Sequence, residues 1–198
     1  MKNKILLAAS AAICIAIAAT GTLAYFTSED TAHNVITSGG VNIEVVEKTK
    51  DGDGVLVDFP EEGITGVMPG TDVSKLVSVK NTGASEAWIR VRVEAAIKGA
   101  DGADLPLNIE GKGPVMTYET GSNWSLNEDG CYYYALPVAP GASTELLLDT
   151  VSFAPEMGNE YQDCTANIVI SAQAVQTANN GQTILEAQGW PENEEVAR

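Results

Sequence analysis

The stretch WIRVRVE, residues 88–94, alternates apolar and polar side chains one residue at a time. In an extended chain Ile89, Val91 and Val93 lie on one side, and the two arginines and the glutamate lie on the other. A period of two is typical of a β-strand that has one face in a protein core and the other in water. The stretch therefore predicts a half-buried strand.

Similar segments, rich in β-branched and aromatic residues, occur on both sides of this strand. Helical periodicity is scarce after residue 25, and short helical insertions are expected only near residues 155–163 and 183–188. The further predicted strands are residues 41–47, 55–59, 73–80, 131–136, 144–153 and 165–174.

Turn sequences with glycine separate these segments, because glycine accepts a positive φ and a neighbouring aspartate or asparagine bonds its own backbone. MPG at residues 68–70 and APG at residues 139–141 suit type II turns, and each precedes a long predicted strand. Seven or more strands with such turns predict an all-β fold. The expected architecture is a two-sheet antiparallel β-sandwich of jelly-roll type with short helical insertions.

Residues 1–24 differ from the rest of the chain. They lack acidic residues, begin with Lys2 and Lys4, continue with an apolar run and end with small residues. This pattern indicates a secretory signal peptide that is cleaved between Ala24 and Tyr25. The alternative is an uncleaved membrane anchor, since about 20 apolar residues span a bilayer. The predicted organisation is a cleaved signal peptide at 1–24, an N-terminal segment at 25–40, a sandwich domain at 41–190 and a charged, frayed tail at 191–198.

Cleavage changes both the charge and the cysteine count. The whole chain has a formal net charge of −16 from 27 acidic and 11 basic residues, and loss of the two lysines gives 9 − 27 = −18. So acidic a chain repels nucleic acid, which is therefore not an expected partner. Loss of Cys14 leaves Cys131 and Cys164, a candidate disulfide in an exported protein. Two independent buried thiols are the alternative.

Familiar catalytic motifs are missing from the sequence. His33 is the only histidine, so an HExxH zinc site is excluded, and GxSxG, GxGxxG and GxxxxGK[ST] do not occur. No catalytic residue, cofactor or metal ligand is therefore predicted. DGDG at 51–54 resembles the start of a calcium loop, but Val55 and Leu56 occupy positions where that loop needs a ligand and a glycine, which favours a hairpin turn. YYY at 132–134 is interpreted as core packing, with a carbohydrate-binding aromatic face as the alternative.

Three groups of residues together resemble one protein family. They are GTLAYFT at 21–27 with TAHN at 31–34 and ITSGGVNI at 36–43, then MPG at 68–70 with VSVKNTG at 77–83 and IRV at 89–91, and finally AQAVQ at 172–176 with Ala187 and Trp190. They resemble the TasA/camelysin family of exported proteins from Gram-positive bacteria, whose signal peptide is removed by a SipW-type signal peptidase. The resemblance covers most of the chain.

The resemblance implies a structural role in the cell envelope. Members of the family are jelly-roll domains secreted to the cell surface or the biofilm matrix, and TasA forms fibres in which the mature N-terminal segment adds as a strand to the next subunit. Carried over to this chain, the donor strand begins with Tyr25, Phe26 and Thr27 and continues to Val35 and Ile36. The implied partners are further copies in head-to-tail filaments and other matrix or cell-wall components. The membrane is contacted only through the signal peptide, before cleavage.

Alternatives remain open at this stage. Through camelysin the family also carries a metallopeptidase label, although this sequence offers no zinc motif for it. A carbohydrate- or surface-binding adhesion module is a further candidate. The N-terminal segment could also pair with its own sheet, in which case the chain stays monomeric.

Overall fold

Two long antiparallel strands, β6 (Ala87–Lys98) and β14 (Thr165–Gln176), form the centre of the structure. They pair over their whole length of 12 residues each, which confirms the strand predicted at 88–94 and extends it at both ends. The computed structural model describes residues 34–37, 41–60 and 63–191.

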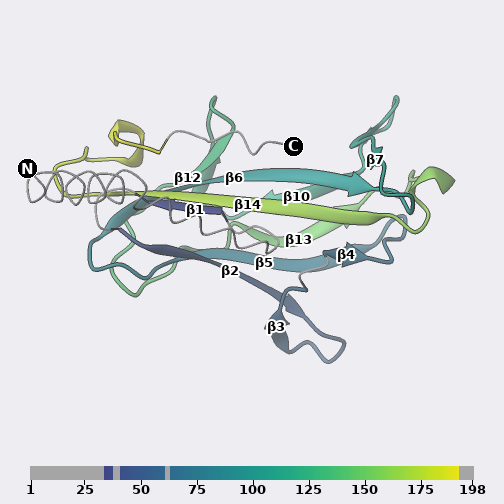
Figure 1. Ribbon diagram of the computed structural model, residues 1–198, viewed down its shortest axis with the longest axis horizontal. Coiled ribbons are helices and arrows are strands. Elements are labelled where there is room, and N and C mark those ends of the chain that lie inside the picture. Colours follow the sequence, from purple (N-terminus) through teal and green to yellow (C-terminus); the bar gives the residue numbers. More distant parts are fainter. Residues whose placement is uncertain (1–33, 38–40, 61–62, 192–198) are drawn as a thin grey trace, which may run out of the picture.

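Two sheets pack face to face (Figure 1). Sheet A has the strand order β1-β14-β6-β12-β11, with β4 added to β14 and β7 added to β6, and sheet B has the order β10-β13-β5-β2-β3. The other strands of sheet A are β1 (Asn34–Thr37), β4 (Ile64–Thr65), β7 (Asp104–Leu105), β11 (Trp124–Leu126) and β12 (Cys131–Tyr134). Those of sheet B are β2 (Ile43–Lys50), β3 (Leu56–Asp58), β5 (Asp72–Asn81), β10 (Met116–Thr120) and β13 (Leu148–Phe153), and β8 (Asn108–Ile109) pairs separately with β9 (Gly113–Pro114).

The core lies between the sheets, because inward and outward side chains alternate along each strand. Ile89 and Val91 of β6 and Val77 and Val79 of β5 are completely buried in the same cluster. Burial of such aliphatic side chains contributes about 1.5–3 kcal/mol each. The alternation that predicted the strands therefore also identifies the side chains that hold the two sheets together.

The Asn-Thr-Gly turn between β5 and β6 joins the two sheets. Asn81 is fully buried, and its amide donates hydrogen bonds of 2.8 Å to the carbonyls of Ser85 and Val138. Its Oδ1 accepts the N–H of Gly83. A Cβ at residue 83 would lie 2.7 Å from the backbone nitrogen of Asn42, so only glycine fits there. The turn is thus specified by side-chain bonding and by close backbone packing.

Both predicted Pro-Gly turns have the expected geometry. Gly70 and Gly141 have φ values of 70° and 79°. The N–H of the residue after each glycine donates to the carbonyl of Met68 (3.3 Å) or of Ala139 (3.0 Å). A positive φ at the third position of a type II turn is the conformation for which glycine is favoured.

The structure confirms an all-β, antiparallel two-sheet sandwich whose chain crosses repeatedly between the sheets. The expected helical insertions are single 3₁₀ turns, η1 (Asn159–Tyr161) and η2 (Ile184–Glu186). Strands β10 and β11 were not predicted. Strand β1 pairs with β14 in parallel, an exception to the antiparallel pattern.

Candidate functional site at the outer edge of strand β14

Strand β14 has one edge that is paired along its whole length and a second edge that is paired only in part by the described residues. Its inner edge carries β6 along all 12 residues. On its outer edge β4 pairs with Thr165 and Ala166, and β1 pairs with residues 171–174. Between them, residues 167–170 have no strand partner on that side within the described part of the chain. Such an edge presents unpaired N–H and C=O groups to any strand that can reach it.

The N-terminal segment supplies strand β1 to this edge. Val35 aligns with Ala172 and Ile36 aligns with Gln173, so these two predicted donor residues lie on the edge as part of their own chain's sheet. Parallel pairing is slightly less stable per residue than antiparallel pairing, and β1 has only four residues. The remaining predicted donor residues, Tyr25, Phe26 and Thr27, and the cleavage position at Ala24 lie outside the described residues.

A glycine shapes the other end of the edge, where the chain crosses from β3 to β4. Gly63 has a φ of 79°. A Cβ at this position would collide with the side chain of Asn167 and would approach the carbonyl of Ala166 to 3.1 Å. The close approach of the crossover to β14 therefore depends on the absence of a side chain at residue 63.

The candidate disulfide between Cys131 and Cys164 is not formed. Cys131 lies opposite Arg92 of β6, whereas Cys164 directly precedes Thr165, which lies opposite Lys98. Lys98 lies six positions after Arg92 along β6, which is about 20 Å of extended strand. A disulfide requires Cα atoms within about 7 Å.

Both cysteines are free and buried. Burial raises the pKa of each thiol, and the nearby Asp129 raises that of Cys131 further. A protonated, buried thiol is a poor nucleophile and is slow to oxidise. The alternative of two independent thiols therefore describes the structure, and neither cysteine is placed as a catalytic group.

A second apolar cluster covers the outer face of sheet A. Trp88, Tyr133 and Val175 are buried there beneath Ile184 and Ala187 of the C-terminal segment, with Trp190 packed against them. The cluster explains why both faces of β6 and β14 carry apolar side chains. It also accounts for the tyrosine run, because neighbouring tyrosines project to opposite faces of sheet A.

Polar contacts of Arg90 link the residues at the border of this cluster. Arg90 stacks on the ring of Trp190, 4.7 Å from its centroid, and donates to Asp129 (3.0 Å) and to the hydroxyl of Tyr133 (2.9 Å). Burial acts to raise the pKa of Asp129, but the N–H of Cys131, the Tyr133 hydroxyl and the charge of Arg90 outweigh it. The pKa of Asp129 therefore lies below that of an ordinary aspartate.

The buried position of Tyr133 contradicts a carbohydrate-binding role for the tyrosine run. Its exposed fraction is 6%, and its hydroxyl donates to Asp129. Tyr134 is buried against Trp124, with 4.9 Å between ring centroids, and Tyr132 packs against the main core. An aromatic binding platform needs an exposed ring face, which this run does not present.

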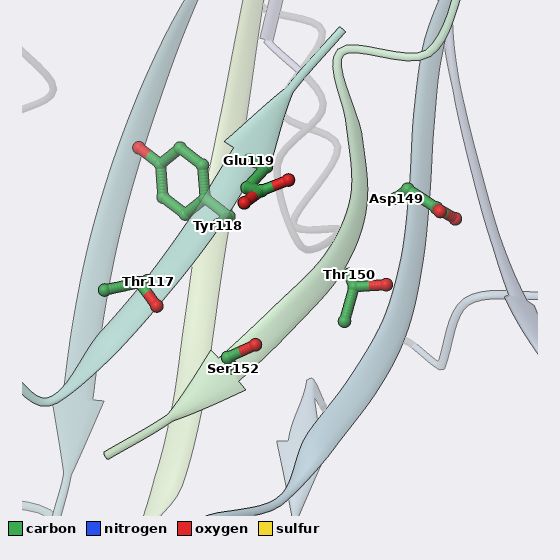
Figure 2. A pocket seen from close by; sticks show the side chains of 6 residues that line it. All are labelled: Thr117, Tyr118, Glu119, Asp149, Thr150 and Ser152. Atoms are coloured by element: carbon green, nitrogen blue, oxygen red, sulfur yellow. The ribbon is translucent and has the colours of Figure 1, made fainter.

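A polar hollow of about 410 Å³ lies on β10 and β13 in sheet B (Figure 2). Its lining consists of hydroxyl and carboxylate groups from Thr117, Tyr118, Glu119, Asp149, Thr150 and Ser152. These six residues include no histidine, cysteine or lysine. Water and small polar solutes fit its chemistry.

No metal centre occurs among the described residues, where no group of three or more His, Cys, Asp or Glu side chains is placed to hold an ion. The Asp-Gly-Asp-Gly sequence forms the predicted hairpin turn instead. The Oδ1 of Asp51 accepts the N–H groups of Asp53 (3.0 Å) and Val55 (2.8 Å). None of the helices in the described ranges is long and apolar enough to span a membrane.

Sequence reasoning missed one buried ion pair. Lys75 is 2% exposed, its Nζ donates to Glu47 at 2.6 Å, and it lies 3.6 Å from the centre of the Phe59 ring. Burial lowers the pKa of Lys75, although the charge and hydrogen bond of Glu47 oppose this shift. The sequence pattern could have revealed this burial, because Lys75 stands two residues before Val77 and therefore projects to the same, inward side of β5.

Comparisons with known proteins add little to these observations. No family model and no curated protein matches the chain. Among solved structures, an ASH/PapD-like domain of human CEP192 is similar at 10% identity, with 78% of this chain and 93% of that domain covered and a TM-score of 0.28. The fold assignment therefore rests on the strand pairing described above.

Proposed function

We propose that this chain is a secreted structural protein of the cell surface or biofilm matrix, related to TasA, and that it polymerises by donating its N-terminal segment to the next copy. The observation that carries the proposal is the outer edge of β14. There a four-residue parallel strand, β1, occupies an edge whose residues 167–170 lack a strand partner among the described residues.

The chemistry of the chain supports a binding role rather than catalysis. A strand that reaches the outer edge of β14 gains backbone hydrogen bonds, which is the basis of β-augmentation. The segment that already pairs there begins within the predicted N-terminal region, so the same segment of another copy can pair in its place. A contact of this head-to-tail kind does not close on itself and produces filaments.

Electron microscopy of the exported protein tests this proposal. The full chain is expressed with its leader in a Gram-positive host, and the secreted product is compared with a Val35→Pro/Ile36→Pro variant. Successive N–H groups of a strand point to opposite sides, so prolines at both positions remove one that faces β14. We expect an N-terminus at Tyr25, filaments from the unmodified product and none from the variant. Filaments of equal length from both proteins would exclude strand donation through β1.

The acidic charge of the chain leads us to expect that filament formation depends on salt and pH. Copies with a formal net charge of −16 or lower repel one another. Added salt screens this repulsion, and acidification neutralises carboxylates. Filament formation is therefore expected to accelerate in 0.5 M salt or near the sequence pI of 4.2 (the salt level is about three times the physiological value). Light scattering follows the rate.

A further inference from the structure

The C-terminal strap, residues 177–191, folds back over the outer face of sheet A. Its Ile184 and Ala187 are buried in one apolar cluster with Trp88 of β6. The indole Nε1 of Trp88 also donates a hydrogen bond of 3.2 Å to the backbone carbonyl of Asn180. The strap is therefore held to the sheet by apolar packing and by polar contacts, one of which lies at Asn180.

The side chain of Asn180 joins two distant parts of this segment. Its Nδ2 donates to the carbonyl of Gln176, the last residue of β14, and to the carbonyl of Gln188, each at 3.0 Å. Its Oδ1 accepts the N–H of Gln188 at 2.8 Å. One amide group thus connects the end of β14 to the far part of the strap.

Asn180 is followed by Gly181, and this is the only Asn-Gly pair in the sequence. In such a pair the backbone nitrogen of the glycine can attack Cγ of the asparagine, because no side chain on the glycine obstructs the approach. The Cγ–Nδ2 bond breaks, and Nδ2 leaves as ammonia with the proton of the attacking N–H. Water then opens the cyclic imide to aspartate or isoaspartate, so the reaction consumes water and releases ammonia.

The surroundings of Asn180 favour this reaction. Within the part of the chain that the structure describes, the N–H of Gly181 has no hydrogen-bond acceptor, so its nitrogen is not engaged. The N–H of Gln188 points at Oδ1, where negative charge develops during the attack, and a donor at that place stabilises the charge. A hollow of about 310 Å³, whose lining includes Asn180 and Gln188, is large enough to hold the water that opens the ring.

We propose that Asn180 is a site of spontaneous deamidation and that this modification loosens the C-terminal strap. The carboxylate that replaces the amide has no N–H group, so the carbonyls of Gln176 and Gln188 lose their donor and face a negative charge. Isoaspartate also inserts the side-chain carbon into the backbone, which displaces the carbonyl that Trp88 binds. The proposal concerns the outer face of sheet A and does not depend on strand donation at the edge of β14.

Peptide mapping of aged protein tests the modification itself. The secreted product of the full chain is incubated for several weeks near neutral pH, and each asparagine is followed by mass spectrometry with fragmentation. Asn179 is the internal reference, because another asparagine follows it. We expect Asn180 to be converted roughly tenfold faster than Asn179, since only glycine leaves the attacking nitrogen unobstructed. An unchanged Asn180, or conversion no faster than that of Asn179, would overturn the proposal.

Hydrogen exchange tests the effect on the strap. Asn180→Asp introduces the product side chain directly. The amides of residues 186–188, which are hydrogen-bonded within the strap, are then expected to exchange roughly tenfold faster than in the unsubstituted protein, because two hydrogen bonds are lost. Amides of β6 should exchange at an unchanged rate, which separates loosening of the strap from unfolding of the domain.

Asn179→Asp is the matched control for this variant. It adds the same charge one residue earlier, where the asparagine side chain makes no hydrogen bond among the described residues and aspartate tolerates the φ of 56°. We expect it to leave the exchange of residues 186–188 unchanged. Equal exchange in the Asn179→Asp and Asn180→Asp variants would contradict the proposed effect of the modification on the strap, whether or not filaments form.

Discussion

The two edges of β14 differ in how they are covered, although they belong to one strand. The inner edge is paired with β6 residue by residue, and both strands contribute side chains to the core. Among the described residues, the outer edge is paired with β4 over two residues and with β1 over four. The difference shows that a strand can be central to the core of a domain and still be paired over only part of its second edge, as far as the described residues extend.

The largest effect is expected from a cavity on the core side of β14. Ile170 is 1% exposed, so Ile170→Ala should lower the free energy of unfolding by about 3 kcal/mol. Val169, the next residue, faces outward and is half-buried, and Val169→Ala should cost about 1 kcal/mol. Urea denaturation measures both. Equal losses would show that β14 is not supported mainly from its core side.

A smaller loss is expected where β4 meets the outer edge. Gly63→Ala places a methyl group against Asn167 and forces alanine to a φ of 79°, at a cost of about 2 kcal/mol. Gly52→Ala is the control, because no atom lies within 4 Å of the added Cβ and its φ is not positive. Thermal unfolding of the two variants compares them. If both variants lost stability equally, or if neither did, the close packing of Gly63 against β14 would not be important for stability.

The β1 end of the edge should contribute little to stability. Val35→Pro/Ile36→Pro removes the pairing of a four-residue strand and is expected to cost about 1 kcal/mol in unfolding free energy. Hydrogen exchange measures the stability of β1 locally. The amides of β1 should exchange much faster than those of β6. Protection of β1 equal to that of β6 would mean that both edges are held alike and would argue against exchange of this strand.

The smallest effect concerns the outer face of sheet A and depends on pH. The pKa of Asp129 is lower in the folded protein than its ordinary value of 3.8. A lowered pKa stabilises the fold above that value, and the contribution is lost as the pH falls through the folded pKa. Asp129→Asn should therefore flatten the decline in stability below pH 3.8. Denaturation at pH 3 and pH 6 compares the slopes, and an unchanged slope would exclude Asp129 as a source.

Much of the fold could be predicted because local chemistry and tertiary environment agree. The alternation at 88–94 and the two Pro-Gly turns were read correctly, since strand periodicity and glycine conformation are properties of short segments. Strands β10 and β11 were missed because they are short and lie among glycines. Lys75 was missed because a charged side chain on an alternating strand is expected to point outward, and its partners Glu47 and Phe59 are distant in sequence.

Only a part of the candidate site could be compared with the sequence, because the structure describes two of the five predicted donor residues. The N-terminal segment was singled out by its resemblance to an exported family, and Val35 and Ile36 lie on the edge of β14. The disulfide prediction was wrong because the number of cysteines does not tell how far apart they lie in the folded chain. Register along β6 separates Cys131 from Cys164 by about 20 Å.

The sequence by itself determined the all-β class, the turn positions and the strongly acidic character of the chain, because each depends on residue type within a few positions. Only the tertiary structure decided which strands became neighbours, how completely each strand edge is paired among the described residues and which apolar residues of the β2–β3 hairpin remained exposed. Those outcomes depend on pairing between segments up to about 140 residues apart, such as β1 and β14. No local pattern encodes them, because hydrogen bonds between strands are alike for almost every residue type.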